Sequence, residues 1–170
     1  LALEPAVRAA VLQAGADPLH QAALAKTQGL VEGAKGNNTA AYDRFMRARE
    51  LSVAARGPAH YDVAVADINL ASIELQLGKR AAAQHRLETV ITAFGATEAG
   101  RRHPTIAQAH QNLCAVAWRQ QDWARSERHC RAAAEVYASS IGPDHPPTAK
   151  SRMYLGRALR QPGRLAEAQT

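Results

Sequence analysis

Histidines and cysteines are the residues of this chain most able to do chemistry. There are seven histidines and two cysteines. His110 lies four residues before Cys114, and His129 immediately precedes Cys130, so a mixed histidine and cysteine zinc site can be drawn. However, the sequence has neither the CxxC nor the HxxxH spacing of common zinc sites. We therefore interpret the cysteines as buried free thiols at a helix contact rather than a disulfide or metal pair, and predict no metal and no cofactor.

Common catalytic and nucleotide-binding motifs do not occur in the sequence. It has no GxGxxG, GxxxxGK[ST], GxSxG or HExxH pattern, and its carboxylates are spread along the chain. Most histidines fall in turns or on second helices, which argues against a convergent site. His103 and His145, each followed by a proline, are interpreted as packing or capping groups of turns. The sequence thus predicts a protein that is not an enzyme.

A repeated turn organises the elements around these residues. Gly57, Gly100 and Gly142 each begin a Gly-x-x-His tetrapeptide, and they stand 43 and 42 residues apart. A leucine recurs in register after each of these turns, eight residues before the turn between the two helices of the pair, at Gly78, Gln121 and Gly163. These leucines are Leu70, Leu113 and Leu155. A period of this length is typical of stacked helical repeats.

The hydrophobic pattern predicts helices and no strands. No segment alternates with period two over a strand length, whereas apolar residues recur at helical spacing throughout. The predicted helices are 3–14, 19–35, 38–56, 60–77, 79–94, 104–120, 123–140, 147–161 and one from 163 onward. Residues 95–102, with two glycines and no periodicity, are predicted to be a loose connection.

Small residues after each repeated leucine, as in Leu70-Ala71, Leu113-Cys114 and Leu155-Gly156, together with the alanine runs that follow, resemble the tetratricopeptide repeat. The 42-residue period is similar to the form found in kinesin light chains and bacterial signalling proteins. The resemblance implies an all-α, right-handed superhelical solenoid of about four antiparallel helix pairs. It implies a single domain over 1–170, with a leading helix at 1–15 and repeats at 19–56, 60–94, 103–140 and 145–170, the last one truncated.

The resemblance also implies a concave groove lined by the first helix of each pair, where a peptide or disordered segment binds. Asn69 and Asn112 recur at equivalent places, and the resemblance implies that such asparagines hold a peptide backbone. The groove residues carried over by register are Asn69, Ser72, Gln76, Gln108, Asn112, Trp118, Arg119, Lys150, Tyr154, Arg157 and Arg160.

Positive charge lies in the C-terminal part of the chain. Residues 1–100 hold 10 Lys and Arg against 10 Asp and Glu, whereas residues 101–170 hold 11 against 5. This asymmetry predicts a protein or peptide partner of acidic character, with an aromatic or leucine anchor. The alternative is a nucleic-acid-associated module that uses the basic part. It is disfavoured because the first two repeats have no excess of positive charge.

The sequence also bears on the location of the protein and on the larger chain to which it belongs. No run approaches the roughly 18 uncharged apolar residues that a membrane span needs. Two cysteines are too few for a disulfide scaffold, which suits a reducing, cytoplasmic location. Because the chain starts at Leu1 and stops within a predicted helix, we expect a fragment of a larger signalling or regulatory chain. We also expect self-association through the truncated C-terminal end.

Overall fold

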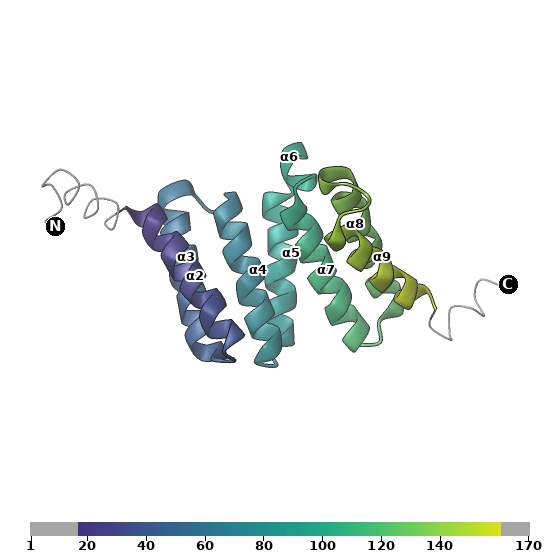
Figure 1. Cartoon of the computed structure of the whole chain (residues 1–170), viewed down its shortest axis with the longest axis horizontal. Helices are drawn as coiled ribbons and strands as arrows, with labels where there is room; N and C mark the ends of the chain where they lie inside the picture. The colour runs from purple at the N-terminus through teal and green to yellow at the C-terminus, as the bar shows by residue number, and fades with distance from the viewer. Residues whose placement is uncertain (1–16, 161–170) are drawn as a thin grey trace, which may run out of the picture. The chain divides into compact units, whose positions relative to one another are not determined.

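The computed structural model describes residues 17–160, which form eight helices and no strand (Figure 1). The helices are α2 (Pro18–Ala34), α3 (Asn38–Arg56), α4 (Tyr61–Gln76), α5 (Arg80–Phe94), α6 (Glu98–Arg101), α7 (Pro104–Arg119), α8 (Trp123–Ile141) and α9 (Pro146–Leu159). The predicted all-α fold is confirmed. The leading helix predicted at 1–15 and the helix predicted from 163 onward lie outside the described residues.

Histidine side chains cap the start of two helices, and His103 is one of the two histidines for which a capping or packing role is predicted. The Nδ1 atom of His60 accepts the backbone N–H of Asp62 at 3.2 Å, at the start of α4. The Nδ1 atom of His103 accepts the backbone N–H of Thr105 at the same distance, at the start of α7. Each ring therefore satisfies a backbone donor that the helix itself leaves open. His145 precedes α9 without such a bond.

The three repeated glycines do not play the same part. Gly57 and Gly142 end α3 and α8 with φ of 82° and 105°, a region that favours glycine. Gly100 instead lies inside α6, and a Cβ atom there would stand 1.9 Å from the carbonyl oxygen of Phe94. The segment predicted as a loose connection therefore contains a short helix that needs glycine for close packing. That expectation was wrong because α6 is too short for periodicity to reveal.

The helices divide into two compact units, Leu1–Gly78 and Lys79–Thr170. The boundary falls inside 60–94, which the sequence predicts as one repeat. In the first unit α3 packs against both α2 and α4. Its hydrophobic cluster consists of Ala41, Phe45, Leu70 and Ile73. A Cβ at Gly29 would stand 2.7 Å from the Phe45 ring, so α2 approaches α3 over a glycine.

An ion pair also joins two helices of the first unit. Arg49 Nε on α3 donates to Asp67 Oδ1 on α4 at 2.8 Å, and the Asp67 side chain is 9% exposed. A nearly buried carboxylate without a partner would cost several kcal/mol, so this contact matters more for which helices pair than for net stability.

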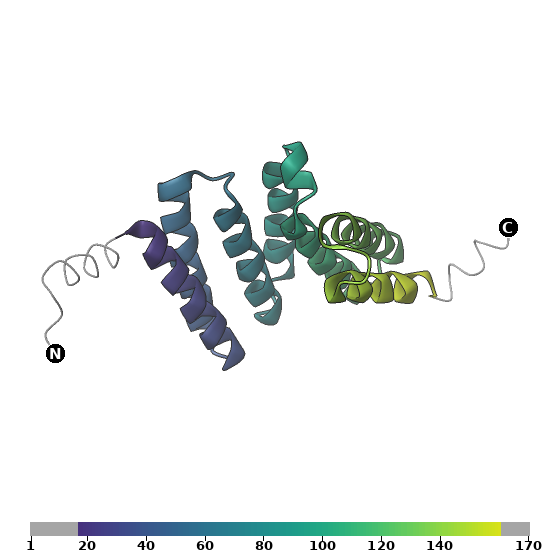
Figure 2. The same cartoon turned by 45° about the horizontal axis from the view of Figure 1, so that its top comes forward.

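In the second unit α7 is the central helix. It packs against α5 and α8 and also touches α9, while α8 packs against α9 (Figure 2). Alanine and other small residues at these contacts allow the helices to approach closely. The buried residues of the second unit that the structure describes include Ala83, Leu87, Val90, Ile106, Ala109, Leu113, Val116, Ser126, Ala133, Tyr137, Thr148 and Ser151. The right-handed superhelix predicted for the whole chain concerns both units together and stays a prediction.

Candidate functional site

The candidate site lies where the C-terminal half of α7 meets α9, within the second unit. A pocket of about 180 Å³ opens there. Its lining residues are Cys114, Ala115, Trp118, Arg119, Tyr154 and Arg157. Two aromatic rings and two guanidinium groups therefore surround one small hollow, which suits an apolar side chain flanked by negative charge.

On α7 the pocket is built around Trp118. Its ring meets that of Trp123, at the start of α8, edge to face, with centroids 5.1 Å apart. This contact restrains the tryptophan while leaving it half-buried rather than fully covered. Arg119 follows in the last turn of α7 and is exposed. A cation is favoured there because the C-terminal end of a helix carries partial negative charge.

On α9 the pocket is built from residues one turn apart. Tyr154 and Arg157 are separated by three positions, so they lie on one side of the helix. Lys150 Nζ lies 5.8 Å from the centroid of the Tyr154 ring, within range of a cation–π contact. Met153 beside them is 47% exposed. The α9 wall thus combines cations with accessible apolar surface.

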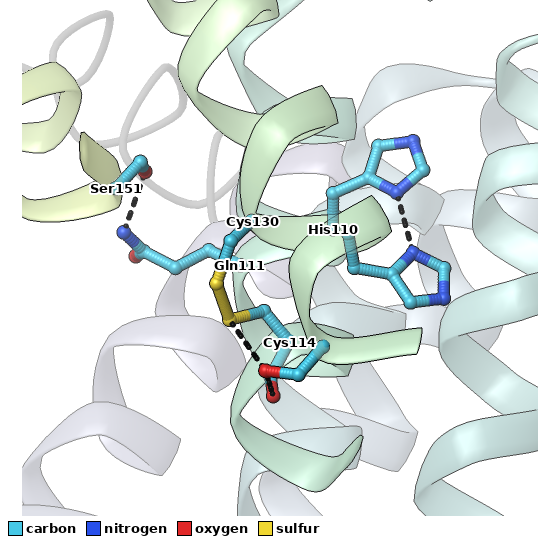
Figure 3. Close-up of a disulfide and its surroundings, with 7 residues drawn as sticks. His110, Gln111, Cys114, Cys130 and Ser151 are labelled. Carbon is cyan, nitrogen blue, oxygen red and sulfur yellow. Dashed lines mark hydrogen bonds between the residues drawn. A yellow bond between two sulfur atoms is a disulfide. The ribbon is translucent and has the colours of Figure 1, made fainter. Parts of the chain in front are cut away.

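A polar contact joins the two walls. Gln111 Nε2 on α7 donates to Ser151 Oγ on α9 at 2.9 Å, and Ser151 is only 1% exposed (Figure 3). A buried hydroxyl that loses its partner costs about 1–3 kcal/mol, so this bond fixes how α9 sits on α7.

The interpretation of Cys114 and Cys130 as free thiols was wrong. They form a disulfide between α7 and α8, with Cα atoms 5.2 Å apart (Figure 3). Cys114 stands in the small position after Leu113, and Cys130 is only 1% exposed on the facing helix. The predicted helix contact is present, and the helices approach so closely there that the two buried sulfur atoms are bonded.

The structure brings together four of the predicted groove residues: Trp118, Arg119, Tyr154 and Arg157 line one pocket, and Lys150 stacks on one of them. Of the others on α7 and α9, Gln108 and Asn112 do not line it. Arg160, which immediately follows α9, does not line it either, and its Nε donates to the Gly156 carbonyl at 3.2 Å.

The predicted groove residues of the second repeat lie on α4, in the first unit. Asn69 is half-buried and Gln76 is exposed. Ser72 Oγ donates to the Ile68 carbonyl at 3.0 Å, which is an internal helix contact. That these residues take part in peptide binding stays a prediction.

Two pocket residues are not among the groove residues named from the sequence: Ala115 and Cys114. Cys114 precedes Ala115 and lies one turn before Trp118, so helical spacing from Trp118 was the available signal. Within residues 17–160 no three His, Cys, Asp or Glu side chains gather in a way that could hold a metal ion. In the same range no helix is long and apolar enough to cross a membrane.

Comparison with known proteins gives two findings. Residues 105–170 match the family model of the tetratricopeptide repeat. Among solved structures, the crystal structure of BtubC (BKLC) from P. vanneervenii is similar, with a TM-score of 0.76 and 19% sequence identity. That match covers 90% of this chain and 61% of BtubC, so the chain spans less than two thirds of that protein's length. No curated protein matches the sequence.

At this level of identity the likeness to BtubC shows the fold, while the family match covers α7, α8 and α9, from which the pocket is built. The two findings agree with the register of leucines and small residues read from the sequence. Residues 105–170 thus carry the tetratricopeptide repeat that the register predicts, and the likeness to BtubC shows a fold of the same kind.

Proposed function

We propose that the chain is a non-catalytic scaffold that binds a peptide or disordered segment of another protein in its groove. The pocket between α7 and α9 takes an apolar or aromatic anchor residue of that segment. The observation that supports this most directly is the convergence of Trp118 and Tyr154 with Arg119 and Arg157 around one hollow. A helical repeat fold is also suited to presenting extended binding surfaces.

The size of the pocket favours a side chain over a free small molecule. Pockets that enclose drug-sized ligands and cofactors are typically ~300–1,000 Å³, whereas this one is about 180 Å³. A single leucine or aromatic side chain of a longer segment is therefore the better fit. Aromatic and arginine residues at such positions commonly dominate the energy of protein interfaces.

The charges around the pocket favour an acidic segment. Lys150, Arg119, Arg157 and Arg160 are all exposed cations on α7, on α9 or just after it. Arginine pairs with carboxylates through two parallel hydrogen bonds, so acidic residues flanking the anchor would be held in register. Asn112, half-buried on α7, is proposed to bond the peptide backbone.

A selected peptide provides the test. A library of acidic peptides, each with one leucine, phenylalanine or tryptophan, is screened against the chain, and the tightest binder is measured by stopped-flow kinetics. R157E/R160E should slow its association about tenfold at low salt and flatten the salt dependence, because steering by charge is reduced. The control is R128E/R152E, which reverses two exposed cations outside the pocket. Equal effects of the two double variants would contradict the proposal.

Asn112 is tested by the dissociation rate. N112A should raise the dissociation rate of the selected peptide about tenfold with little change in association, because it removes a hydrogen bond formed only after encounter. An unchanged dissociation rate would remove Asn112 from the site. If neither R157E/R160E nor N112A alters binding, the convex face becomes the better candidate.

The second candidate function is a nucleic-acid-associated module. It is favoured by the excess of 14 Lys and Arg over 7 Asp and Glu in residues 79–170. Binding of random single-stranded oligonucleotides is measured over a series of salt concentrations. Tight binding with a steep salt slope would favour this function over peptide recognition, since phosphate contacts release counterions.

We further propose that the scaffold belongs to a cytoplasmic signalling or regulatory chain, although a reducing compartment would not favour the Cys114–Cys130 disulfide. In that compartment Cys114 and Cys130 would be held as thiols, so non-reducing mass spectrometry of protein from its native cells tests the location. The proposed self-association through the C-terminal end involves residues beyond those the structure describes. Light scattering over a concentration series tests it, and a strict monomer would exclude it.

A further inference from the structure

Two histidines that play no part in the proposed pocket face each other across α7 and α8. His110 Nδ1 lies 3.0 Å from His129 Nδ1, although the residues are 19 positions apart (Figure 3). The ring centroids are 5.3 Å apart and the planes are inclined by 33°. Both rings are half-buried. The two Nδ1 atoms therefore face each other across the contact between α7 and α8.

The surrounding structure holds this arrangement in place. His110 is one helical turn before Cys114, and His129 is next to Cys130, so the disulfide ties the two helices together close to the rings. Ser126 on α8 adds a second tie, because its Oγ donates to the Cys114 carbonyl at 3.2 Å. These two contacts hold α7 against α8 beside the rings.

Both rings are held in the neutral form that can donate a lone pair. Burial lowers the pKa of His110. Burial, followed by the neighbouring His110, Arg128 and Arg125, lowers the pKa of His129 to about 4. At neutral pH neither ring needs to lose a charge before it binds a cation.

The neighbouring arginines do not forbid a cation. Arg125 forms an ion pair with Glu88 on α5 and a hydrogen bond with Gln84 at 3.1 Å, so its charge is balanced locally. The negative charge of Asp122, at the start of α8, raises the pKa of His129 and so favours a positive charge there. Arg128 is exposed, and solvent screens its effect.

From this geometry we propose that His110 and His129 form a two-imidazole site for a borderline divalent metal ion such as Zn²⁺ or Cu²⁺, bound through both Nδ1 atoms. Metal–nitrogen bonds of about 2.0–2.1 Å at a tetrahedral angle place two nitrogens roughly 3.3 Å apart. The rings therefore need to separate by a few tenths of an ångström and to turn so that both lone pairs point at the ion. Water or a donor from a partner completes the coordination. Imidazole ligands favour Cu²⁺ and Zn²⁺ over Ca²⁺ and Mg²⁺, which prefer oxygen.

Binding requires a change of tautomer and no net loss of a proton. Without metal, one Nδ1 carries the hydrogen that bonds the two rings, and the other accepts it. With metal, that proton moves to Nε2 of the same ring through solvent, and both Nδ1 lone pairs coordinate the ion. Because Cys114 and Cys130 are joined, no thiolate competes for the metal in the oxidised chain.

The experiment titrates the oxidised full chain with Zn²⁺ and with Cu²⁺ by calorimetry. One equivalent should bind, and H110Q and H129Q should each weaken binding at least about tenfold, because ligand-shell changes in metal sites typically cost ~10–100-fold. The matched control is H85Q, which makes the same change at an exposed histidine on α5 and should leave the affinity unchanged. Equal affinity for the wild type and H110Q/H129Q would overturn the proposal.

A spectroscopic measurement on the wild type keeps the test independent of how the variants fold. Electron paramagnetic resonance of the Cu²⁺-loaded chain should show coupling to two imidazole nitrogens. A spectrum with one or none would overturn the proposal even if H110Q and H129Q are misfolded by circular dichroism. Zn²⁺ should also raise the melting temperature of the wild type and of H85Q but not that of H110Q/H129Q, whereas Mg²⁺ should raise none of them.

Discussion

At the scale of single residues, the repeated leucine is a fully buried core residue in each unit. Leu70 is 0% exposed in the first unit and Leu113 is 1% exposed in the second. Each follows its Gly-x-x-His turn at a similar distance, so the register that predicted the groove residues rests on them. A buried leucine stabilises the folded state in two ways, because its apolar surface is removed from water and because its atoms pack closely against their neighbours.

We therefore expect L70A and L113A each to lower the free energy of unfolding by ~2–5 kcal/mol, because each leaves a cavity in a packed helix contact. Thermal melts followed by circular dichroism measure it. L24A is the control, since Leu24 is 59% exposed and its loss should have little effect. If L70A and L113A melt within a degree of the wild type, the register is wrong.

Gln121 adopts a positive φ, a backbone conformation that favours glycine. It stands where the equivalent turn has Gly78, and its φ is 60° where that of Gly78 is 76°. Residues other than glycine are strained in this region because Cβ approaches the following carbonyl.

Q121G should accordingly raise the free energy of unfolding by about 1 kcal/mol, as relief of strain outweighs the added freedom of the unfolded chain. Gln120, whose φ is −88°, provides the matched control. Q120G should instead destabilise the chain, because glycine adds freedom there without relieving strain. A loss of stability in Q121G, measured by urea unfolding, would contradict this account.

At the scale of helices, α7 and α8 are joined by a covalent bond as well as by hydrogen bonds. A disulfide, the bond from Ser126 to the Cys114 carbonyl and the histidine pair all bridge the two helices. Because α7 supplies four of the six pocket residues and α9 packs against α8, the position of α7 on α8 affects how Trp118 lies relative to Tyr154.

C114S and C130S should each cost about 3 kcal/mol of stability under oxidising conditions, as expected for closing a loop of this length. Denaturant unfolding with and without a dithiol reductant measures the effect. The reduced wild type should resemble both serine variants. If reduction leaves the wild type unchanged while the variants are destabilised, the cost is one of packing rather than of the covalent bond.

At the scale of the molecule, the chain consists of two compact units with different charge. Residues 1–78 hold 7 Lys and Arg against 8 Asp and Glu, so the positive charge belongs to residues 79–170. The candidate pocket and the proposed metal site are both built from helices of the second unit alone.

Residues 79–170 expressed alone should thus fold as a helical unit and bind the selected acidic peptide within about twofold of the full chain, because a compact unit has its own core. Circular dichroism and calorimetry test both statements. A folded fragment that binds at least tenfold more weakly would show that groove residues of α4, such as Asn69 and Ser72, belong to the site.

The sequence by itself determined the long helices between residues 17 and 160 and their order. Turn glycines, first-turn prolines and apolar spacing act over about four positions, so these signals can be read without knowing the fold. The same register placed Trp118, Arg119, Tyr154 and Arg157 on one side of the repeats, and the structure gathers these four around one pocket.

Only the tertiary structure decided which side chains meet across helices. Cys114 reaches Cys130 and His110 reaches His129 over 16 and 19 positions, and each pairing depends on how α7 is rotated and how closely it packs on α8. The division at Gly78–Lys79 likewise follows from where packing is dense. Such contacts depend on the spacing and rotation of two helices, quantities set by all the side chains between them rather than by any local pattern.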